Sequence, residues 1–407
     1  MTSNKQSIEF SKLLKNNEKP KIIHNDLTYR KLNQNDFLIK CIYKINENFI
    51  LLFLSMILIL LIIIYILLAS IKSNQKLVNN NKFNTIYNDK QIYEEKIIKK
   101  YKKLNLTNIY NETKMCSENK EFAILSRINC QACGLFSYYI VHLGCIITYL
   151  NEGYIPIIDV SSYLNVFNGF NESLIDKENR WEKFFYQPCG YTLNEVKLKN
   201  NINYFMCECS DNMPSEKEVY SNKTLLKHFR YIANQYMSVK KEIIDEADII
   251  WEKLFKDSKN VLGLLVRGTD YISIKPSFHS IPPTADMVIK DAIKMNFENK
   301  YDFIFLATED NKIRQKFIKE FGNKLKYLLP EKIIKYNYDE GNYLSMYDDS
   351  FGNMKFQKTY LLSMIILSKC LDIISSRTSG AAGAYILSKG FRNDFVYYIG
   401  EYPEYYR

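Results

Sequence analysis

The chain has 407 residues, of which 47% are hydrophobic, 14% aromatic and 25% charged, and its formal net charge is +10. This length exceeds one small domain and suits two domains with additional segments. The lysines are spread through Asn- and Ile-rich sequence instead of forming a basic arm, so we do not expect a nucleic-acid-binding protein.

The N-terminal part contains one long apolar segment. Residues 1–47 are polar and predict a cytoplasmic tail, whereas residues 48–71, NFILLFLSMILILLIIIYILLASI, carry no charge. A helix of this length spans roughly 30 Å of hydrocarbon. Buried core helices are rarely apolar on every face, and cleaved signal peptides have a shorter apolar run nearer the start. The segment predicts one uncleaved transmembrane signal anchor.

The orientation of this anchor is indicated by the residues on its C-terminal side. The flanking lysines and arginines are nearly balanced and do not decide it. All four glycosylation sequons, at Asn105, Asn111, Asn171 and Asn222, and eight of nine cysteines come after the span. Sequons and disulfides belong to an oxidising lumen, although spacing does not give the connectivity. We expect a type II membrane protein with its C-terminal body in the lumen of the Golgi or endoplasmic reticulum.

Residues 72–112 are polar, rich in Asn and Lys, and predict a stem. The next residues, 113–255, predict a first Rossmann-like domain. A strand over 121–128, a helix ending near Leu150 and a strand over 154–160 form a βαβ unit. Residues 224–255 predict one long helix or two.

Residues 256–407 predict a second Rossmann-like domain. Its expected strands are residues 260–266, 302–308, 324–329, 371–376 and 394–400, and its expected helices are 284–296, 311–321, 356–370 and 379–390. This alternation predicts an α/β fold with a doubly wound, mostly parallel sheet. Two such halves predict two Rossmann-like domains facing each other across a cleft.

Polar residues follow three of these strands at the ends where open α/β sheets bind ligands. They are Arg267 and Asp270 after the first strand, Thr308, Glu309 and Asp310 after the second, and Ser375, Ser376, Arg377, Thr378 and Ser379 around the end of the fourth. A Ser/Thr loop that opens a helix offers N–H groups to an anion, and two arginines can bind a diphosphate. The alternatives are structural: helix caps, an Arg267–Asp270 pair, and His279 as a surface residue.

Three segments of this half resemble motifs of the fucosyltransferase superfamily of GT-B fold, especially the alpha-1,6-fucosyltransferases and their bacterial relatives. VRGTDYISIKPSFHSI, with Arg267 and His279, is similar to the first motif; FIFLATED and IISSRTSGAAG are similar to the second and third. The resemblance implies a GT-B-like fold in which residues 113–255 form the acceptor-side domain and residues 256–407 bind the nucleotide sugar. It also implies inverting, metal-independent transfer from GDP-fucose. It implies that Arg267 neutralises the diphosphate, that Glu309 or Asp310 contacts the nucleoside, and that residues 375–379 complete the phosphate site. The sequence departs from the motif at Leu265, Gly268 and Lys275.

The chemistry of such a transfer needs donors for the departing diphosphate and a base for the acceptor hydroxyl. Asp270 and His279 are the candidate bases, with Asp270 ranked first. No Asp-x-Asp pair is present, so we expect no metal and no cofactor besides the donor. The expected partners are a nucleotide sugar, a glycan or glycoprotein acceptor, and the membrane. The alternatives are another nucleotide sugar on the same fold, or a non-catalytic membrane-anchored glycan-binding protein.

Overall fold

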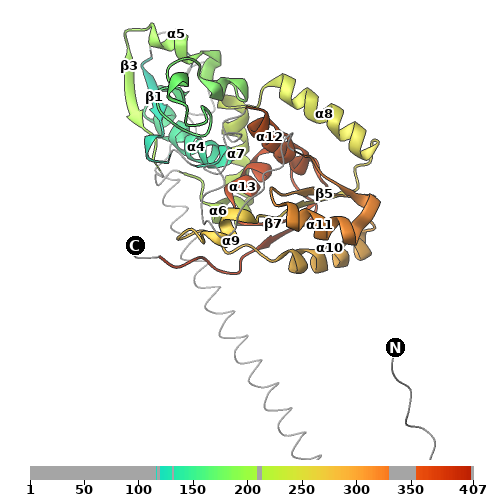
Figure 1. Ribbon diagram of the computed structural model, residues 1–407. Coiled ribbons are helices and arrows are strands. Elements are labelled where there is room, and N and C mark those ends of the chain that lie inside the picture. Colours follow the sequence, from blue (N-terminus) through green and yellow to red (C-terminus); the bar gives the residue numbers. More distant parts are fainter. Residues whose placement is uncertain (1–115, 117–119, 131–132, 209–212, 330–353, 405–407) are drawn as a thin grey trace, which may run out of the picture. The chain divides into compact units, whose positions relative to one another are not determined.

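The computed structural model describes residues 116, 120–130, 133–208, 213–329 and 354–404, all within one compact unit formed by residues 96–407 (Figure 1). The predicted tail (1–47), transmembrane anchor (48–71) and stem (72–112) lie outside the described residues. Within the described part of the chain, none of the helices combines the length and the apolar character that a membrane crossing requires.

The first sheet contains three parallel strands, β1 (Phe122–Ser126), β2 (Ile155–Asp159) and β3 (Ile202–Met206), in the order β2-β1-β3. Helix α4 (Leu135–Asn151) connects β1 to β2 and packs on both strands. The predicted βαβ unit is therefore confirmed. Strand β3 was not predicted from the sequence, because this edge strand exposes Tyr204 and Met206 and its apolar residues are not buried on both faces.

The second sheet contains five parallel strands in the order β6-β5-β4-β7-β8. They are β4 (Val261–Leu265), β5 (Phe303–Ala307), β6 (Leu325–Lys326), β7 (Asp372–Ser376) and β8 (Asp394–Tyr397). All five strands were predicted, although β6 is shorter than the apolar run around it. The order reverses between β4 and β7, as it does in doubly wound nucleotide-binding folds.

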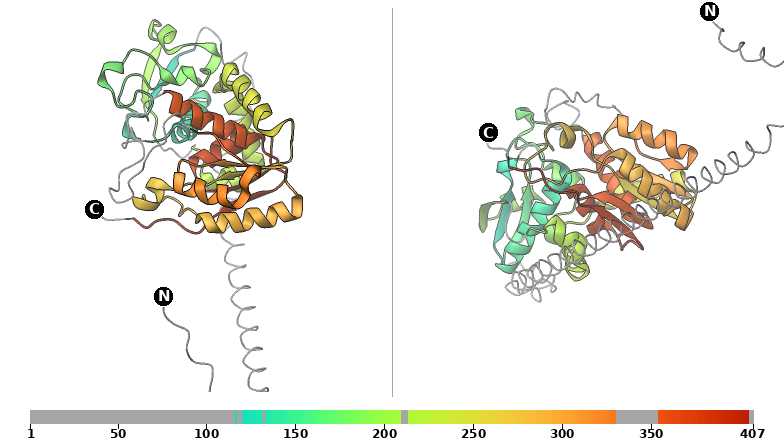
Figure 2. Two further views of the ribbon diagram at one scale, coloured as in Figure 1. Left: turned by 45° about the vertical axis from the view of Figure 1, so that its right-hand side comes forward. Right: turned by 90° about the horizontal axis from the view of Figure 1, so that it is seen from below.

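Helices cover both faces of this sheet, and Figure 2 shows α10 and α11 (orange) and α12 (red) on opposite sides of the strands. Helices α10 (Ala285–Asn299) and α11 (Asn311–Phe321) pack on the face formed by Leu262, Leu264 and their neighbours. Helix α12 (Met354–Lys369) packs on the opposite face over Gly263, where a Cβ atom would lie 3.0 Å from Leu367. Because side chains alternate along a strand, both faces are apolar, as in buried parallel sheets.

The helical segment between the two sheets consists of two helices, α7 (Lys223–Tyr236) and α8 (Lys241–Phe255), preceded by the short α6 (Glu216–Ser221). Helix α8 packs against α12, whereas α6 and α7 pack against α13 (Ser379–Leu387). Helix α13 also packs against α4, as the ribbon shows (Figure 1). The two parallel sheets are therefore joined through helix packing around α13. Two further short helices are α5 (Leu193–Lys197) and α9 (Thr269–Ser273).

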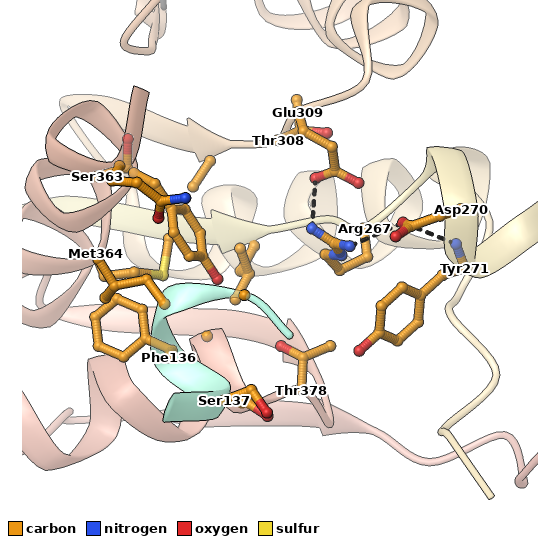
Figure 3. A pocket seen from close by; sticks show the side chains of 18 of the residues that line it. Phe136, Ser137, Arg267, Asp270, Tyr271, Thr308, Glu309, Ser363, Met364 and Thr378 are labelled. Atoms are coloured by element: carbon orange, nitrogen blue, oxygen red, sulfur yellow. Dashed lines mark hydrogen bonds and ion pairs between the residues drawn. The ribbon is translucent and has the colours of Figure 1, made fainter. Parts of the chain in front are cut away.

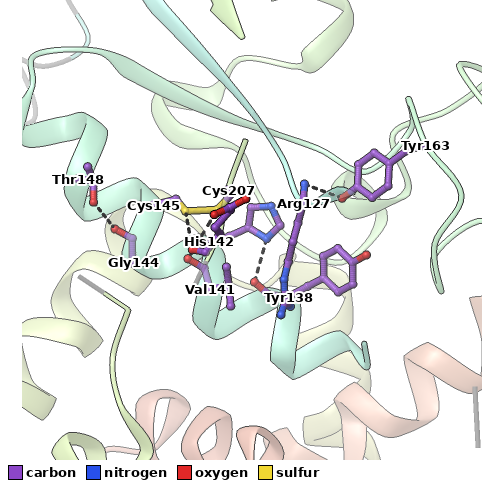
Figure 4. The surroundings of a disulfide bond; sticks show 10 residues. Arg127, Tyr138, Val141, His142, Gly144, Cys145, Thr148, Tyr163 and Cys207 are labelled. Atoms are coloured by element: carbon purple, nitrogen blue, oxygen red, sulfur yellow. Dashed lines mark hydrogen bonds between the residues drawn. A yellow bond between two sulfur atoms is a disulfide. The ribbon is translucent and has the colours of Figure 1, made fainter. Parts of the chain in front are cut away.

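Three disulfides join Cys116 to Cys189, Cys130 to Cys133, and Cys145 to Cys207. The Cys145–Cys207 bond ties α4 to the chain that comes after β3 (Figure 4). Cys370 is free and buried. Of the eight cysteines on the C-terminal side of the apolar span, Cys209 lies outside the described residues.

A buried histidine lies next to the Cys145–Cys207 disulfide (Figure 4). His142 on α4 is 0% exposed, and its Nδ1–H donates to the carbonyl of Tyr138 at 2.8 Å. Its Nε2 has no hydrogen-bond partner within the described part of the molecule. Burial lowers the pKa of His142 to about 3, because a charged imidazolium cannot be solvated there.

We expect this histidine to make the fold sensitive to acid. The unfolded chain takes up a proton below about pH 6.5, whereas the folded chain does so only near pH 3. The stability contribution of His142 is therefore complete above pH 6.5 and falls by about 1.4 kcal/mol for each lower pH unit. The free energy of unfolding, measured in urea at pH 7.0 and at pH 5.0, should fall between these two pH values by about 2 kcal/mol less in His142→Leu than in the wild type. Equal losses in both proteins would contradict this expectation.

Candidate functional site

The predicted polar residues meet at the carboxyl edge of the second sheet. The register pairs Leu265 at the end of β4 with Ala307 of β5 and with Ser375 of β7. The residues just past these strands therefore emerge side by side. The strand order reverses between β4 and β7, which is where such sheets bind ligands.

A cavity of about 230 Å³ lies at this edge (Figure 3). Its walls come from the first residues of α4, from the ends of β4 and β5, from α12, and from the start of α13. Predicted residues in its lining are Arg267, Asp270, His279, Thr308, Glu309, Thr378 and Ser379. The predicted Asp310, Ser375, Ser376 and Arg377 do not line it.

Arg267 is the central cation of the cavity (Figure 3). Its Nη2 donates to Oδ1 of Asp270 at 2.9 Å, and its Nη1 lies 3.5 Å from Oε2 of Glu309. The guanidinium also lies 4.6 Å from the ring centre of Tyr271. Burial acts to lower the pKa of Arg267, but the charges of Glu309 and Asp270 outweigh it and raise that pKa. The side chain is a fixed cation, and its buried Nε has no hydrogen-bond partner among the described residues.

The two acidic residues after β5 have different roles. Glu309 lines the cavity, and its Oε1 accepts from the N–H of Gly268 at 2.8 Å and from the hydroxyl of Thr269. Asp310 is buried and caps α11, where its Oδ1 accepts from the N–H groups of Lys312 and Ile313. Asp310 is therefore a helix cap, which is the structural alternative considered for these residues, whereas Glu309 holds the loop that carries Arg267 by hydrogen bonds.

Gly268, one of the departures from the motif, is explained by this packing. A Cβ atom at residue 268 would overlap the carboxylate of Asp310. The close approach of Asp310 therefore leaves no room for a side chain, basic or otherwise. Lys275, another departure, is exposed and lies outside the lining of the cavity.

The Ser/Thr segment after β7 divides between the sheet and the cavity. Ser375 and Ser376 are buried within β7, and their hydroxyls have no partner in the part of the chain that is described. Arg377 lies 3.9 Å from the ring centre of Tyr398. Thr378 caps α13 by accepting from Ala381 N–H at 3.1 Å, and Ser379 begins that helix.

The start of α13 has the geometry that suits an anion. Thr378, Ser379 and Gly380 line the cavity, and among the described residues the N–H groups of Ser379 and Gly380 have no hydrogen-bond partner. The first N–H groups of a helix point toward such a ligand, and the helix dipole favours negative charge there. Together with Arg267, this helix start gives the cavity a wall of hydrogen-bond donors, although Asp270 and Glu309 offset the charge of Arg267.

The two candidate bases differ in their freedom. The Asp270 carboxylate accepts from Arg267, from the Thr269 hydroxyl and from its neighbouring N–H group of Tyr271. His279 is exposed, and its Nδ1 lies 2.9 Å from the carbonyl of Ser277. That contact requires a proton on Nδ1, so Nε2 of the neutral ring is an acceptor.

Three features of the lining were not identified from the sequence: Arg314 of α11, Tyr360 of α12, and the first turn of α4 with Ser137. The phenol of Tyr360 lies over Gly380, where a Cβ atom would overlap it. Burial raises the pKa of Tyr360 to about 12, so its hydroxyl stays protonated and can donate. Arg314 could have been identified from the sequence. It comes four residues after Asp310, one turn into a helix that begins at the end of a strand, and side chains at that position can face the ligand edge of the sheet.

No group of three or more His, Cys, Asp or Glu side chains suited to a metal ion occurs in residues 120–130, 133–208, 213–329 and 354–404. The expected metal independence stays a prediction.

No family model and no curated protein matches the chain. Among solved structures, it is similar to fucosyltransferase NodZ from Bradyrhizobium, with 13% identity, 66% of this chain and 94% of that chain covered, and a TM-score of 0.39. POFUT1 in complex with GDP matches with 6% identity, coverage of 69% and 99%, and a TM-score of 0.37. A mutant of Arabidopsis thaliana FUT1 in complex with GDP matches with 10% identity, coverage of 75% and 78%, and a TM-score of 0.40. Likeness at this level assigns no activity, donor or acceptor to this chain.

Proposed function

We propose that this chain is an inverting glycosyltransferase that transfers fucose from GDP-fucose to a glycan or glycoprotein acceptor. The observation that carries the proposal is the meeting of Arg267 with the open start of α13 in one cavity. These two groups come after β4 and β7, the strands between which the sheet order reverses. Nucleotide phosphates bind at such positions in doubly wound sheets.

The chemistry of the site supports a diphosphate leaving group. Breaking the bond between the anomeric carbon and the diphosphate oxygen leaves negative charge on that oxygen. Fixed donors in a water-poor cavity stabilise such charge without having to reorganise. Arg267 offers its Nε and remaining Nη protons, and Ser379 and Gly380 offer backbone N–H groups. These donors hold the phosphates while the sugar leaves.

We assign the acceptor proton to His279 and not to Asp270. Nε2 of His279 is an acceptor and has no hydrogen-bond partner in the described residues, whereas the Asp270 carboxylate is already bound by Arg267 and Thr269. A base must reach the hydroxyl whose proton it takes. In this proposal Asp270 orients Arg267, and Glu309 fixes the loop behind it.

We also propose that residues 48–71 anchor the protein as a type II membrane protein, with the catalytic body in the Golgi or endoplasmic reticulum lumen. The uncharged span and the later sequons support this orientation. The three disulfides in the body add support, because such bonds persist in oxidising compartments.

A second candidate is a non-catalytic, membrane-anchored glycan-binding protein. The observation that favours it is the pairing of Arg267 with both Asp270 and Glu309, which offsets its charge. An enzyme acting on another nucleotide sugar is a third candidate, with the same phosphate site.

The test is thermal unfolding of the purified full-length chain with GDP, UDP, CMP or ADP. A ligand that binds only the folded state adds about 2.7 kcal/mol at one hundred times its Kd. We expect GDP alone to raise the unfolding temperature. A shift with UDP instead would change the donor, and no shift with any nucleotide would favour the glycan-binding candidate. The anomeric configuration of the product, compared with that of the donor, tests inversion.

A further inference from the structure

Arg314 is a buried arginine that faces the cavity and has no carboxylate within ion-pair distance among the described residues. It is 2% exposed, lies on α11 and forms part of the cavity lining. We infer that Arg314 hydrogen-bonds the nucleobase of the nucleoside diphosphate and selects guanine, which makes it a further residue that binds the donor substrate. This inference rests on the proposed function.

The hydrogen bonds of Arg314 leave donors unused. Its Nη1 donates to Oδ1 of Asn311 at 3.1 Å, and its Nη2 donates to the carbonyl of Thr308 at 3.2 Å. The buried Nε has no partner in the described part of the chain. An arginine has five N–H donors, so three remain here, including the adjacent Nε–H and second Nη–H.

The electrostatic setting of Arg314 differs from that of Arg267. Arg267 has two carboxylates against it, whereas the partners of Arg314 are one amide oxygen and one carbonyl. Burial lowers the pKa of Arg314, because the charged guanidinium is poorly solvated there. A buried donor without an acceptor is costly, and a ligand that supplies acceptors removes this cost.

The position of Arg314 across the sheet indicates the part of the donor that it meets. Along the carboxyl edge, α11 comes after β5, Arg267 after β4, and α13 after β7. Strands lie about 4.8 Å apart, so Arg314 and the start of α13 are on opposite sides of Arg267. A diphosphate held between Arg267 and α13 leaves the β5 side of the cavity, where Arg314 lies, for the nucleoside.

The geometry of the free donors selects among bases. An arginine binds the O6 and N7 acceptors of guanine with two parallel hydrogen bonds. Adenine presents one acceptor beside an amino donor at the same edge, and a guanidinium has no acceptor to offer that amino group. The centre of the Tyr327 ring lies 5.7 Å from the guanidinium carbon of Arg314, so the ring packs against one side of the guanidinium group.

The experiment measures the affinity of the full-length chain for GDP, 7-deaza-GDP, UDP, ADP and inorganic pyrophosphate by calorimetry. We expect wild type to bind GDP roughly 10- to 100-fold more tightly than 7-deaza-GDP, which lacks the N7 acceptor. Arg314→Met, which keeps the unbranched apolar stem and removes the guanidinium group, should lose this preference and bind pyrophosphate as wild type does. The wild-type comparison needs no variant, so misfolding of Arg314→Met leaves the inference testable.

Arg230→Met is the matched control. Arg230 is half-buried and does not line the cavity, and its partners among the described residues are the carbonyl of Tyr385 and the hydroxyl of Ser388. It should retain the preference for GDP over 7-deaza-GDP.

Four outcomes would overturn the inference: equal wild-type affinity for GDP and 7-deaza-GDP, an unchanged preference in folded Arg314→Met, equal weakening of pyrophosphate and GDP in that variant, or tighter wild-type binding of UDP than of GDP. Binding of no nucleoside diphosphate by wild type would instead remove the proposed function itself, and the inference with it.

Discussion

Replacing Arg267 with alanine is expected to lower the rate of sugar transfer by about 1,000-fold or more. Removing one fixed donor from a developing oxyanion costs about 100- to 1,000-fold, and an arginine on phosphoryl charge is worth at least as much. Arg267 follows β4 and Arg377 follows β7, the two strands that flank the reversal of sheet order, and of these two arginines Arg267 lines the cavity. The measurement is the rate of GDP release from GDP-fucose, with and without a glycan acceptor, by wild type and variant.

The same substitution removes the cation that holds Asp270 and Glu309. Their side chains are each 12% exposed, so both carboxylates would lose their closest positive charge in a poorly solvated place. We therefore expect a lower unfolding temperature as well as lower transfer. Arg267→Lys separates the effects, because it keeps the charge and loses the planar fork. It should recover more of the stability than of the activity. Normal turnover by a folded Arg267→Ala protein would refute the assignment.

The arrangement of strands was predictable because parallel, buried strands carry apolar runs that end in polar residues. Residues 261–265, 303–307 and 372–376 show this pattern, and all three are strands of one sheet. Edge strand β3 was not predicted, because alternate side chains face solvent. The bounds of the shortest strand, β6, also depend on pairing that local sequence does not encode.

The site was predictable at the level of loops and not of side chains. Arg267 and the Thr378–Ser379 pair were expected at strand ends, and they do line one cavity. Whether Glu309 or Asp310 faces that cavity depends on which carboxylate caps α11, and the sequence offers two adjacent acids for that role. Tyr360 is the one tyrosine of α12, and nothing in the local sequence shows that it faces the cavity, so only tertiary packing reveals it.

The second large effect is expected at Gly383, where α13 meets α4. A Cβ atom at residue 383 would overlap the ring of Phe136, which is 1% exposed. In an isolated helix, alanine is about 1 kcal/mol more favourable than glycine. Overpacking a buried contact costs about 1–3 kcal/mol or more, so it should reverse that sign. We expect Gly383→Ala to lower the free energy of unfolding by about 2 kcal/mol in urea denaturation.

A second substitution shows whether the ring is the cause. Phe136→Leu alone should destabilise the protein, because it empties part of a buried contact. Combined with Gly383→Ala, it should cost less than the sum of the two single changes, since the new methyl group takes space that the ring leaves. Additive losses would mean that the glycine serves another purpose.

The first turn of α4, which carries Phe136 and Ser137, also lines the cavity. Pushing α4 away from α13 should therefore weaken donor binding in Gly383→Ala, and the double variant should restore part of it. Such a result would tie the packing between the two sheets directly to the shape of the site.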